Sequence, residues 1–342
     1  MRKKVAIFMI VLAILSAILV VYTVWDNNRV IVASHGITID HLPDDLEDFK
    51  ILQITDLHEK EFGKDQSKLI KTINSIDYDA IVFTGDLLKT QGSKNYSSVY
   101  KLLDGIQNKK NAFYVPGNED PEVYHVSSKG ILKKDEFVKG MEKRGVKLLE
   151  SVYSIKKNKS TIYFVNFDMS VQNINYKVQM LNGVVTPQYQ QSSQFVNQRK
   201  QLLKQMEVLD HAKGSDVIIA LNHFPVADAR IDQLRKDPTL KYRDYDLIIA
   251  GHYHGGQVRI PFVGALFVPE AFSNRNGFFP PRNRVKGLWE YKNTKQYVSA
   301  GLGSSEAVPF LKFRIFNPPE INLLTLKREV NHRRDTGKLI TF

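Results

Sequence analysis

The sequence predicts an α/β fold built around a mostly parallel sheet, preceded by one membrane-spanning helix. Short apolar segments typical of strands alternate with connections long enough for a helix. Such connections imply parallel strands, because a tight turn cannot return the chain in the same direction. An uncharged apolar run near the N-terminus indicates the membrane span. With 342 residues, of which 43% are hydrophobic, the chain is long enough for one large α/β domain behind that span.

The N-terminal segment carries the signals of a membrane anchor. A basic N-terminus over residues 1–4 precedes an uncharged apolar run over residues 5–25, and about 20 such residues match the hydrocarbon thickness of a bilayer. The basic residues before the run outweigh Asp26 and Arg29 after it, so the positive-inside rule leaves the N-terminus in the cytoplasm. We expect a single-pass signal-anchor in the cell membrane with an extracytoplasmic domain. A cleaved export signal is the alternative, and it would leave the domain on the same side.

The rest of the chain divides into three parts. Residues 26–48 are expected to form a stalk with an edge strand, in two pieces at Val30–Ala33 and Ile37–Ile39. The folded domain is expected over residues 49–327, and residues 328–342 form a polar tail.

In the first half of the domain, strands and helices alternate. Strands are predicted at Phe49–Thr55, Tyr78–Thr84 and Ala112–Val115. The connecting helices are predicted at Asp65–Ser75 and Tyr96–Ile106, where apolar residues recur at helical spacing.

The second half is less regular. A helix, a short strand, a hairpin and a later helix are predicted at Phe137–Lys143, Val146–Leu149, Ser154–Lys157 with Thr161–Asn166, and Phe195–His211. The first half of the segment from residue 170 to 213 is either a mobile cap near the site or an irregular surface connection. Further strands are predicted at Asp216–Leu221, Tyr245–Ala250, Val258–Ile260, Ala265–Val268, Gly287–Tyr291, Gln296–Ala300, Phe313–Ile315 and Glu320–Lys327.

Five of the predicted strands end in residues that can bind a metal ion. These candidate ligands are Asp56, His58, Asp86, Asn118, His223, His252 and His254. Parallel sheets bind their ligands outside the carboxyl ends of the strands, so these side chains are expected to meet at one edge. The two pairs spaced i, i+2 can each aim at one point, because such residues share a face in extended backbone. Asp86 can bridge two ions through its two oxygens.

Composition limits the chemistry of this site. The chain has no cysteine, so metal ions must be held by nitrogen and oxygen ligands, which suits Mn, Zn, Fe or Mg. The net charge of +12 favours anionic partners such as phosphate esters. Two neighbouring ions activate water and neutralise the oxygens of a phosphoryl group. The pattern therefore predicts a hydrolytic metal enzyme.

The ordered motifs resemble those of the calcineurin-like metallophosphoesterases. They are Asp56-x-His58, Gly85-Asp86, Gly117-Asn118, Asn222-His223 and Gly251-His252-x-His254. Two further motifs are similar to the membrane-associated bacterial subgroup, which includes phosphodiesterases and UDP-2,3-diacylglucosamine pyrophosphatases. They are Gly255-Gly256-Gln257 and Arg314-x-x-Asn317-Pro318-Pro319-Glu320.

This resemblance implies a fold and a ligand assignment. The fold would be a four-layer α/β/β/α sandwich with two sheets. One ion would take Asp56, His58, Asp86 and His254, and the other would take Asp86, Asn118, His223 and His252. Asn118 and His223 are also the candidates for binding the substrate phosphate.

The chain departs from the family at one candidate catalytic position. The family usually has Gly-Asn-His at the third motif, where this chain has Gly117-Asn118-Glu119, and the family histidine helps to stabilise the phosphoryl group and to protonate the leaving oxygen. Glu119 cannot donate a proton as a cation. Three explanations follow: the leaving group needs no proton, as in a pyrophosphate or aryl ester; another residue such as His125 substitutes; or catalysis is slow or lost.

The sequence thus predicts a membrane-anchored phosphoesterase. It would hydrolyse a phosphodiester or pyrophosphate bond of an envelope or lipid-linked substrate with two divalent ions (Mn, Zn or Fe). The alternative is a non-catalytic or weakly active envelope protein that binds metal or phosphate. A nuclease would use the same ions, but nothing in the chain resembles a base-stacking platform, so no specific nucleic acid partner is expected. No oligomeric state is predicted.

Overall fold

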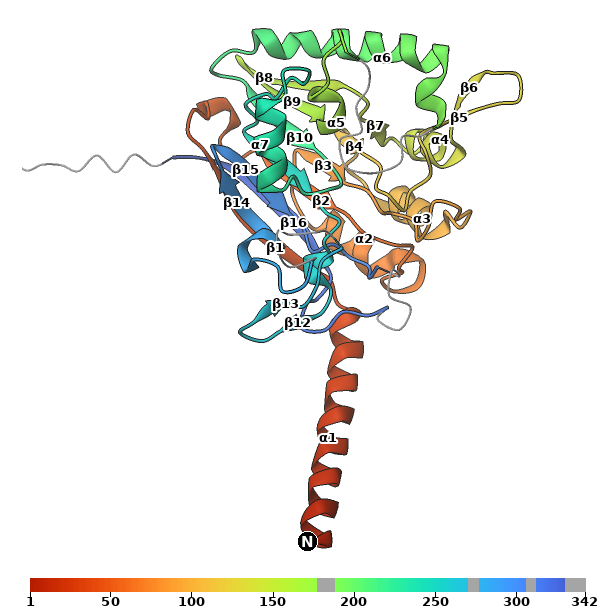
Figure 1. The fold of residues 1–342 in the computed structure, drawn as a ribbon, viewed down its shortest axis with the longest axis vertical. Coiled ribbons are helices and arrows are strands. Elements are labelled where there is room, and N and C mark those ends of the chain that lie inside the picture. The colour runs from red at the N-terminus through yellow and green to blue at the C-terminus, as the bar shows by residue number, and fades with distance from the viewer. Residues whose placement is uncertain (177–187, 270–276, 306–311, 330–342) are drawn as a thin grey trace, which may run out of the picture.

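The computed structural model describes residues 1–176, 188–269, 277–305 and 312–329, and it begins with a long isolated helix. Helix α1 (Arg2–Asn27) projects from the folded domain (Figure 1). Its most apolar window has a mean hydropathy of 3.0, and no part of that window is buried against the domain. The helix is therefore long enough and apolar enough to cross a membrane.

The first sheet has six strands in the order β1-β16-β2-β3-β4-β7. Their bounds are Ile31–Ile39 (β1), Glu320–Arg328 (β16), Lys50–Ile54 (β2), Ala80–Phe83 (β3), Ala112–Tyr114 (β4) and Lys147–Leu148 (β7). β2, β3, β4 and β7 pair in parallel, as helix-length connections predict. β16 runs antiparallel to β2, and β1 runs parallel to β16 at the sheet edge. The two expected pieces of edge strand form one continuous β1.

The second sheet also has six strands, in the order β14-β15-β11-β10-β9-β8. Their bounds are Gly287–Tyr291 (β14), Thr294–Val298 (β15), Leu247–Ala250 (β11), Val217–Leu221 (β10), Ser160–Asn166 (β9) and Val152–Lys157 (β8). β9, β10, β11 and β15 are parallel. The outer pairs β8–β9 and β14–β15 are antiparallel hairpins, and the first of these matches the predicted hairpin.

Helices cover the outer face of each sheet. The first sheet carries α2 (Ser67–Asn74), α3 (Ser97–Gly105) and α4 (Glu136–Lys143), which pack on its buried apolar residues. The second sheet carries α5 (Phe167–Ser170), α7 (Asp228–Lys236) and the short 3-10 helix η4 (Met206–His211). η4 continues α6 (Ser193–Gln205), so the helix predicted up to His211 changes type before its end. Pattern reasoning missed α7, which buries only Ile231 and Leu234.

Side-chain alternation in β2 shows how the four layers are held. Leu52 and Ile54 pack with the helices of the outer layer, whereas Ile51 packs between the sheets with residues of β10 and β11. Strands whose two faces are both covered need apolar residues on both faces. Gln53 is the polar exception, and its amide donates hydrogen bonds to Thr84 Oγ1 and Ala250 O, both at 2.8 Å, which ties the two sheets together. The α/β/β/α sandwich is confirmed.

Among the described residues, two small hairpins lie outside the sandwich. β5 (Tyr124–Val126) pairs with β6 (Leu132–Lys134), and this hairpin was not predicted. β12 (Arg259–Ile260) pairs with β13 (Gly264–Ala265) beside the upper end of α1 (Figure 1). The strand expected at Phe313–Ile315 forms only a single bridge, between Ile315 and Val258. Residues 330–342 of the expected polar tail fall outside the described residues, as do residues 177–187 of the irregular connection.

Candidate metal centre

The structure brings all seven candidate ligands to one place, where strands of both sheets end. Asp56 and His58 follow β2, Asp86 follows β3 and Asn118 follows β4. His223 follows β10 of the second sheet, and His252 and His254 follow β11. The two sheets therefore contribute to one centre, as ligand binding at the carboxyl ends of parallel strands predicts.

The first group of ligands consists of Asp56, His58, Asp86 and His254. One ligand atom from each lies within 4.8 Å of all the others. The Nε2 atoms of His58 and His254 are 3.3 Å apart, and His58 Nε2 is 3.7 Å from Asp86 Oδ2. All four side chains are buried, with at most 4% of the residue exposed.

The second group consists of Asp86, His223 and His252, with Asn118 beside them. His223 Nε2 lies 3.3 Å from Asp86 Oδ2, 3.1 Å from His252 Nδ1 and 3.2 Å from Asn118 Oδ1. Asp86 belongs to both groups, so its carboxylate is in place to join two ions.

The backbone that aims these side chains is left-handed, which corrects the expectation of extended backbone. The φ angles are +51° at Asp56, +47° at His58, +52° at Asp86, +69° at His252 and +50° at His254. Positive φ is uncommon for non-glycine residues, although Asp and His tolerate it better than most. The paired ligands converge because the chain turns sharply after each strand, and the alternation of a strand does not continue through them.

Glycines next to the ligands leave the room that the centre needs. A Cβ atom on Gly117 would lie 2.2 Å from Asp86 Oδ1, and one on Gly251 would lie 2.6 Å from Asp56 Oδ2. Neither distance is possible for real atoms, so any side chain at these positions would displace a ligand.

Hydrogen bonds orient the ligands from behind. His223 Nδ1 donates to Thr84 O at 2.8 Å, so Nε2 is the ring nitrogen that faces the centre. The N–H of His252 donates to both oxygens of Asp56, at 3.1 and 3.2 Å. The N–H of Glu119 donates to Asp86 Oδ1 at 2.8 Å, which leaves Oδ2 toward the histidines.

Burial and mutual charge shift the pKa values of these groups strongly. Burial raises the pKa of Asp56 to about 7 and lowers that of His252 to about 3. Burial also disfavours charged His223, but the carboxylate of Asp86 outweighs it and raises the pKa of His223 to about 9. The ion-free centre therefore keeps one proton on His223 to balance Asp86.

These observations fit a pair of divalent cations. The donors are imidazole nitrogens, carboxylate oxygens and one amide oxygen, which suit Mn, Zn or Fe. They form two compact groups with a shared carboxylate, and a cation in each would replace the proton that now balances Asp86.

Comparison with known proteins decides the family. The family model described as Calcineurin-like phosphoesterase matches residues 49–256, more than half of the chain. The chain belongs to this family. It is thus a metal-dependent hydrolase of phosphoester bonds.

The relatives of this phosphoesterase are distant. The uncharacterized metallophosphoesterase YkuE of Bacillus subtilis is 25% identical over 301 residues, which cover 86% of this chain and 84% of that protein. The UDP-2,3-diacylglucosamine pyrophosphatase LpxG of Chlamydia muridarum is 24% identical over 299 residues, covering 82% and 84%. A solved structure, the 5'-nucleotidase precursor of Thermus thermophilus, aligns with 73% of this chain but only 48% of its own, at 10% identity. Its TM-score of 0.33 is too low to define the fold.

Glu119 lies half-buried beside the second ligand group of the phosphoesterase. Its Oε1 accepts a hydrogen bond from Asn118 Nδ2 at 2.9 Å, which turns the amide oxygen of Asn118 toward His223. Burial and the charge of Asp86 raise the pKa of Glu119. His125, the other candidate proton donor, is exposed on β5. The structure therefore gives Glu119 a positioning contact that sequence reasoning did not anticipate.

Two buried residues that hold the centre together were missed as functional positions. Asp120 accepts hydrogen bonds from the N–H groups of Leu87, Leu88 and Gly117, so one carboxylate ties the loop of Asp86 to that of Asn118. Arg314 donates to the carbonyls of His254, Ala300, Gly303 and Asn317. Both residues lie in motifs that the sequence shows, but only the fold reveals which loops they join.

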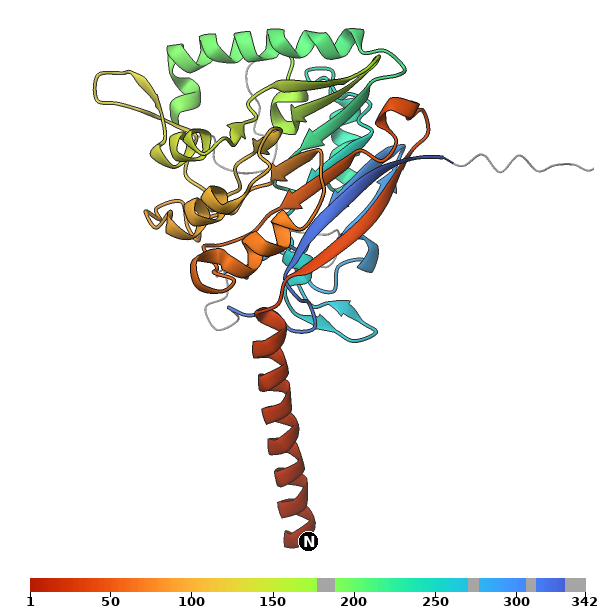
Figure 2. The same ribbon diagram turned by 180° about the vertical axis from the view of Figure 1, so that it is seen from behind.

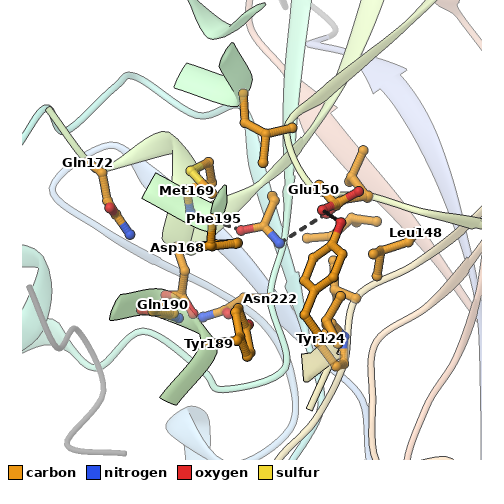
Figure 3. Close-up of a pocket in the computed structure, with 17 residues that line it drawn as sticks. Tyr124, Leu148, Glu150, Asp168, Met169, Gln172, Tyr189, Gln190, Phe195 and Asn222 are labelled. Carbon is orange, nitrogen blue, oxygen red and sulfur yellow. Dashed lines mark hydrogen bonds between the residues drawn. The ribbon is translucent and has the colours of Figure 1, made fainter. Parts of the chain in front are cut away.

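A cavity of about 180 Å³ lies between loops of the two sheets, with residues such as Tyr124, Glu150 and Asn222 in its lining (Figure 3). Pro116 and Asn222 line it, and they are near neighbours of Asn118 and His223 in sequence. The aromatic residues Tyr124, Tyr189 and Phe195 pack together in its wall. Described residues of the segment after residue 170, namely Gln172, Tyr189, Gln190 and Phe195, therefore line this cavity.

Proposed function

We propose that this phosphoesterase is anchored in the cell membrane by α1 and hydrolyses a phosphodiester or pyrophosphate bond of an envelope or lipid-linked substrate. The observation that carries the proposal is the pair of ligand groups sharing Asp86, whose atoms lie within 4.8 Å of one another in each group. A phosphoryl group has several oxygens that two adjacent cations can neutralise together, which a carbonyl substrate does not need.

The chain would hold two ions with its own side chains. Asp56, His58, Asp86 and His254 would hold one, and Asp86, Asn118, His223 and His252 the other. When bound, the ions would supply Lewis acidity that activates water near neutral pH and stabilises negative charge on phosphoryl oxygens. Thr84 O accepts a hydrogen bond from Nδ1–H of His223, which keeps Nε2 available in the neutral ring.

Asn118 and His223 would also orient the substrate phosphate, because they belong to the partly open second group. Glu119 fixes the amide of Asn118 by accepting a hydrogen bond from its Nδ2. A glutamate here does not supply the cationic acid that the family histidine supplies. The best substrate is therefore one whose leaving group departs without protonation, such as a pyrophosphate or an aryl ester.

The similarity to a UDP-2,3-diacylglucosamine pyrophosphatase supports a pyrophosphate attached to lipid. The apolar α1 supports a location at a membrane, and the basic residues before it support an extracytoplasmic domain. Because the chain has no cysteine, a single cysteine at exposed Lys110 tests this orientation. Labelling of intact cells by a membrane-impermeant maleimide is expected. Labelling only after lysis would place the domain in the cytoplasm.

The deciding experiment uses the full chain in lipid nanodiscs. Bound metal is counted by mass spectrometry, and turnover of an aryl phosphodiester, an alkyl phosphodiester and a lipid pyrophosphate is measured with and without Mn²⁺. Two ions per chain and Mn²⁺-dependent turnover are expected. Fewer than two ions without turnover would contradict the ligand assignment.

A non-catalytic binding protein is the second candidate, and Glu119 is the observation that favours it. It predicts two bound ions with no turnover of any of the three substrates. Restoration of turnover by Glu119→His would then identify the substituted position as the cause.

A further inference from the structure

The order of strands turns the metal-bearing edge of the first sheet toward α1. β1 starts at Ile31, just after α1 ends at Asn27. β16 is parallel to β1, and β2, β3 and β4 run in the opposite direction to both. β2 to β4 therefore end at the edge where β1 begins, which is the side from which the helix projects (Figure 2).

Hydrogen bonds through Arg314 join the end of the helix to the metal centre. The side chain of Asn27 donates to Arg314 O at 2.7 Å and accepts from Arg314 N at 2.8 Å. The guanidinium of the same arginine donates to His254 O at 3.2 Å. Arg314 thus links the helix terminus, through its backbone, to the loop of a metal ligand, through its side chain.

Beside this junction the domain exposes apolar side chains that a water-facing surface does not need. We call them the foot, and they are Ile260, Phe262, Val263, Phe313 and Phe316, exposed by 40, 94, 48, 38 and 42%. Phe262, at the turn of the β12–β13 hairpin, has a φ of +64°, which is rare for a bulky residue. The turn thus directs its most apolar residue away from the domain.

The foot is continuous with α1. The ring of Phe316 lies 5.5 Å from that of Tyr22, a residue within the uncharged apolar run of the helix. Backbone bonds from Arg259 N to Ile315 O and from Ile315 N to Gln257 O join the hairpin to the segment of Phe313 and Phe316. The foot therefore lies at the depth of the last turns of the helix.

Basic residues flank the foot. Arg259 is partly exposed at the start of β12, and the exposed Arg282 packs against the backbone of Gly264 in the same hairpin. Aromatic side chains with neighbouring arginines are typical of surfaces that enter the headgroup region of a membrane, where apolar groups reach the acyl chains and cations meet phosphates.

We propose that the foot is a second membrane contact, inserted into the same bilayer as α1, which holds the metal-bearing edge of the sheet at the lipid surface. The substrate class follows from this placement: a phosphate ester or pyrophosphate whose apolar part stays in that bilayer. The proposal rests on α1 being a membrane anchor, as in the proposed function, and a bilayer is favoured over a protein partner because the foot continues the surface of α1.

Tryptophan quenching in nanodiscs tests the contact without requiring turnover. The full chain carrying Phe262→Trp, or Val263→Trp as a second variant, is placed in phosphatidylcholine nanodiscs with lipids brominated in the upper acyl chain. All proteins carry Trp289→Phe, so that native Trp25 at the end of α1 reports on the helix, and Val196→Trp on α6 is the control. Val196 is 37% exposed, and α6 lies at the end of the domain away from α1 (Figure 1).

Bromine is expected to remove most of the emission added by Phe262→Trp and almost none of that added by Val196→Trp. If Trp25 is quenched but the Phe262→Trp emission behaves like the control, the foot does not enter the bilayer and the proposal is overturned. If quenching of the Phe262→Trp emission instead decreases as the protein concentration rises, a second copy of the chain covers the foot. This outcome would also overturn the proposal. If Trp25 itself is not quenched, α1 is not a membrane anchor, and the proposal for the foot, which rests on that anchor, is rejected as well. This outcome does not depend on the result of the phosphoesterase assay.

The substrate class has its own measurement. The ratio of turnover of a long-chain lipid phosphodiester in the same nanodisc to that of its short-chain soluble analogue is compared between variants. Phe262→Asp is expected to lower this ratio several-fold, because a charge at the foot opposes insertion, whereas Val196→Asp is not. An unchanged ratio in Phe262→Asp would show that the foot does not bring the centre to lipid substrates.

Discussion

The two ligand groups that share Asp86 differ in their access to solvent. Asp56, His58 and His254 of the first group are buried. In the second group His223 is buried as well, whereas Asn118 is partly exposed and half-buried Glu119 lies beside it. Closed metal sites retain their ion, whereas sites with an open position exchange ligands and admit substrate. The comparison therefore predicts that the first group holds its ion firmly and that the second receives the phosphate.

The largest effect is expected from Asp86→Asn, because this change removes the carboxylate common to both groups. We expect turnover with Mn²⁺ to fall by about 10³-fold or more, since an amide oxygen neither bridges two cations nor balances their charge. Mass spectrometry should find a loss of metal from both sites. Asp77→Asn is the matched control, because the side chain of Asp77 is 92% exposed and pairs with Lys50 at the surface. Full activity in Asp86→Asn would refute the shared ligand.

Single histidine variants separate the two groups. His254→Ala should lose the firmly held ion and destabilise the fold by about 2 kcal/mol, because the side chain is buried. His252→Ala should lose mainly the exchangeable ion and less stability. Metal counting after dialysis and thermal unfolding measure both effects. His211→Ala, at an exposed surface position, is the control. Equal losses of metal and stability in the two variants would remove the distinction between a closed and an open site.

Variants of Glu119 test the second ligand group alone. Glu119→Ala should lower kcat/KM about tenfold by releasing Asn118, whereas Glu119→Gln should retain activity because its amide oxygen still accepts from Asn118. Glu119→His should raise the ratio of alkyl to aryl phosphodiester turnover by about 10²-fold, since only the alkyl ester needs an acid. Glu122→Ala, at an exposed position, is the control. A larger loss in Glu119→Gln than in Glu119→Ala would exclude the positioning contact.

The smallest effect expected is a pH dependence of metal stabilisation. The pKa of His223 is raised from 6.5 to about 9 by Asp86, so the contribution of this ion pair to ion-free stability is complete below pH 6.5 and disappears as pH rises toward 9. An ion competes with that proton, so the gain in Tm from Mn²⁺ over EDTA should grow across the same range. Asp86→Asn, which lacks the pair, should show no such growth. A gain that shrinks with pH would contradict the assignment.

Much of the site follows from local sequence patterns. Strand, glycine and ligand lie within a few residues of one another in Gly85-Asp86 and Gly251-His252, so their association needs no knowledge of the fold. The parallel strands β2 to β4 follow likewise from helices of amphipathic spacing between them. In contrast, α7 was not predicted, because it buries only two residues. The β5–β6 hairpin was not predicted either, because its second strand, Leu132–Lys134, is largely polar.

The features of the site that the sequence did not predict depend on contacts between distant segments. The left-handed turns at the ligands, the carbonyl of Thr84 behind His223 and the bracket formed by Asp120 arise only when several strand ends crowd at one point. The approach of the metal edge to α1 has the same origin. It follows from β16, near the C-terminus, lying between β1 and β2 and reversing the direction of the sheet. Residue types at strand ends are a local property of the chain, but strand order is set by the burial of both sheet faces at once, which no local pattern records.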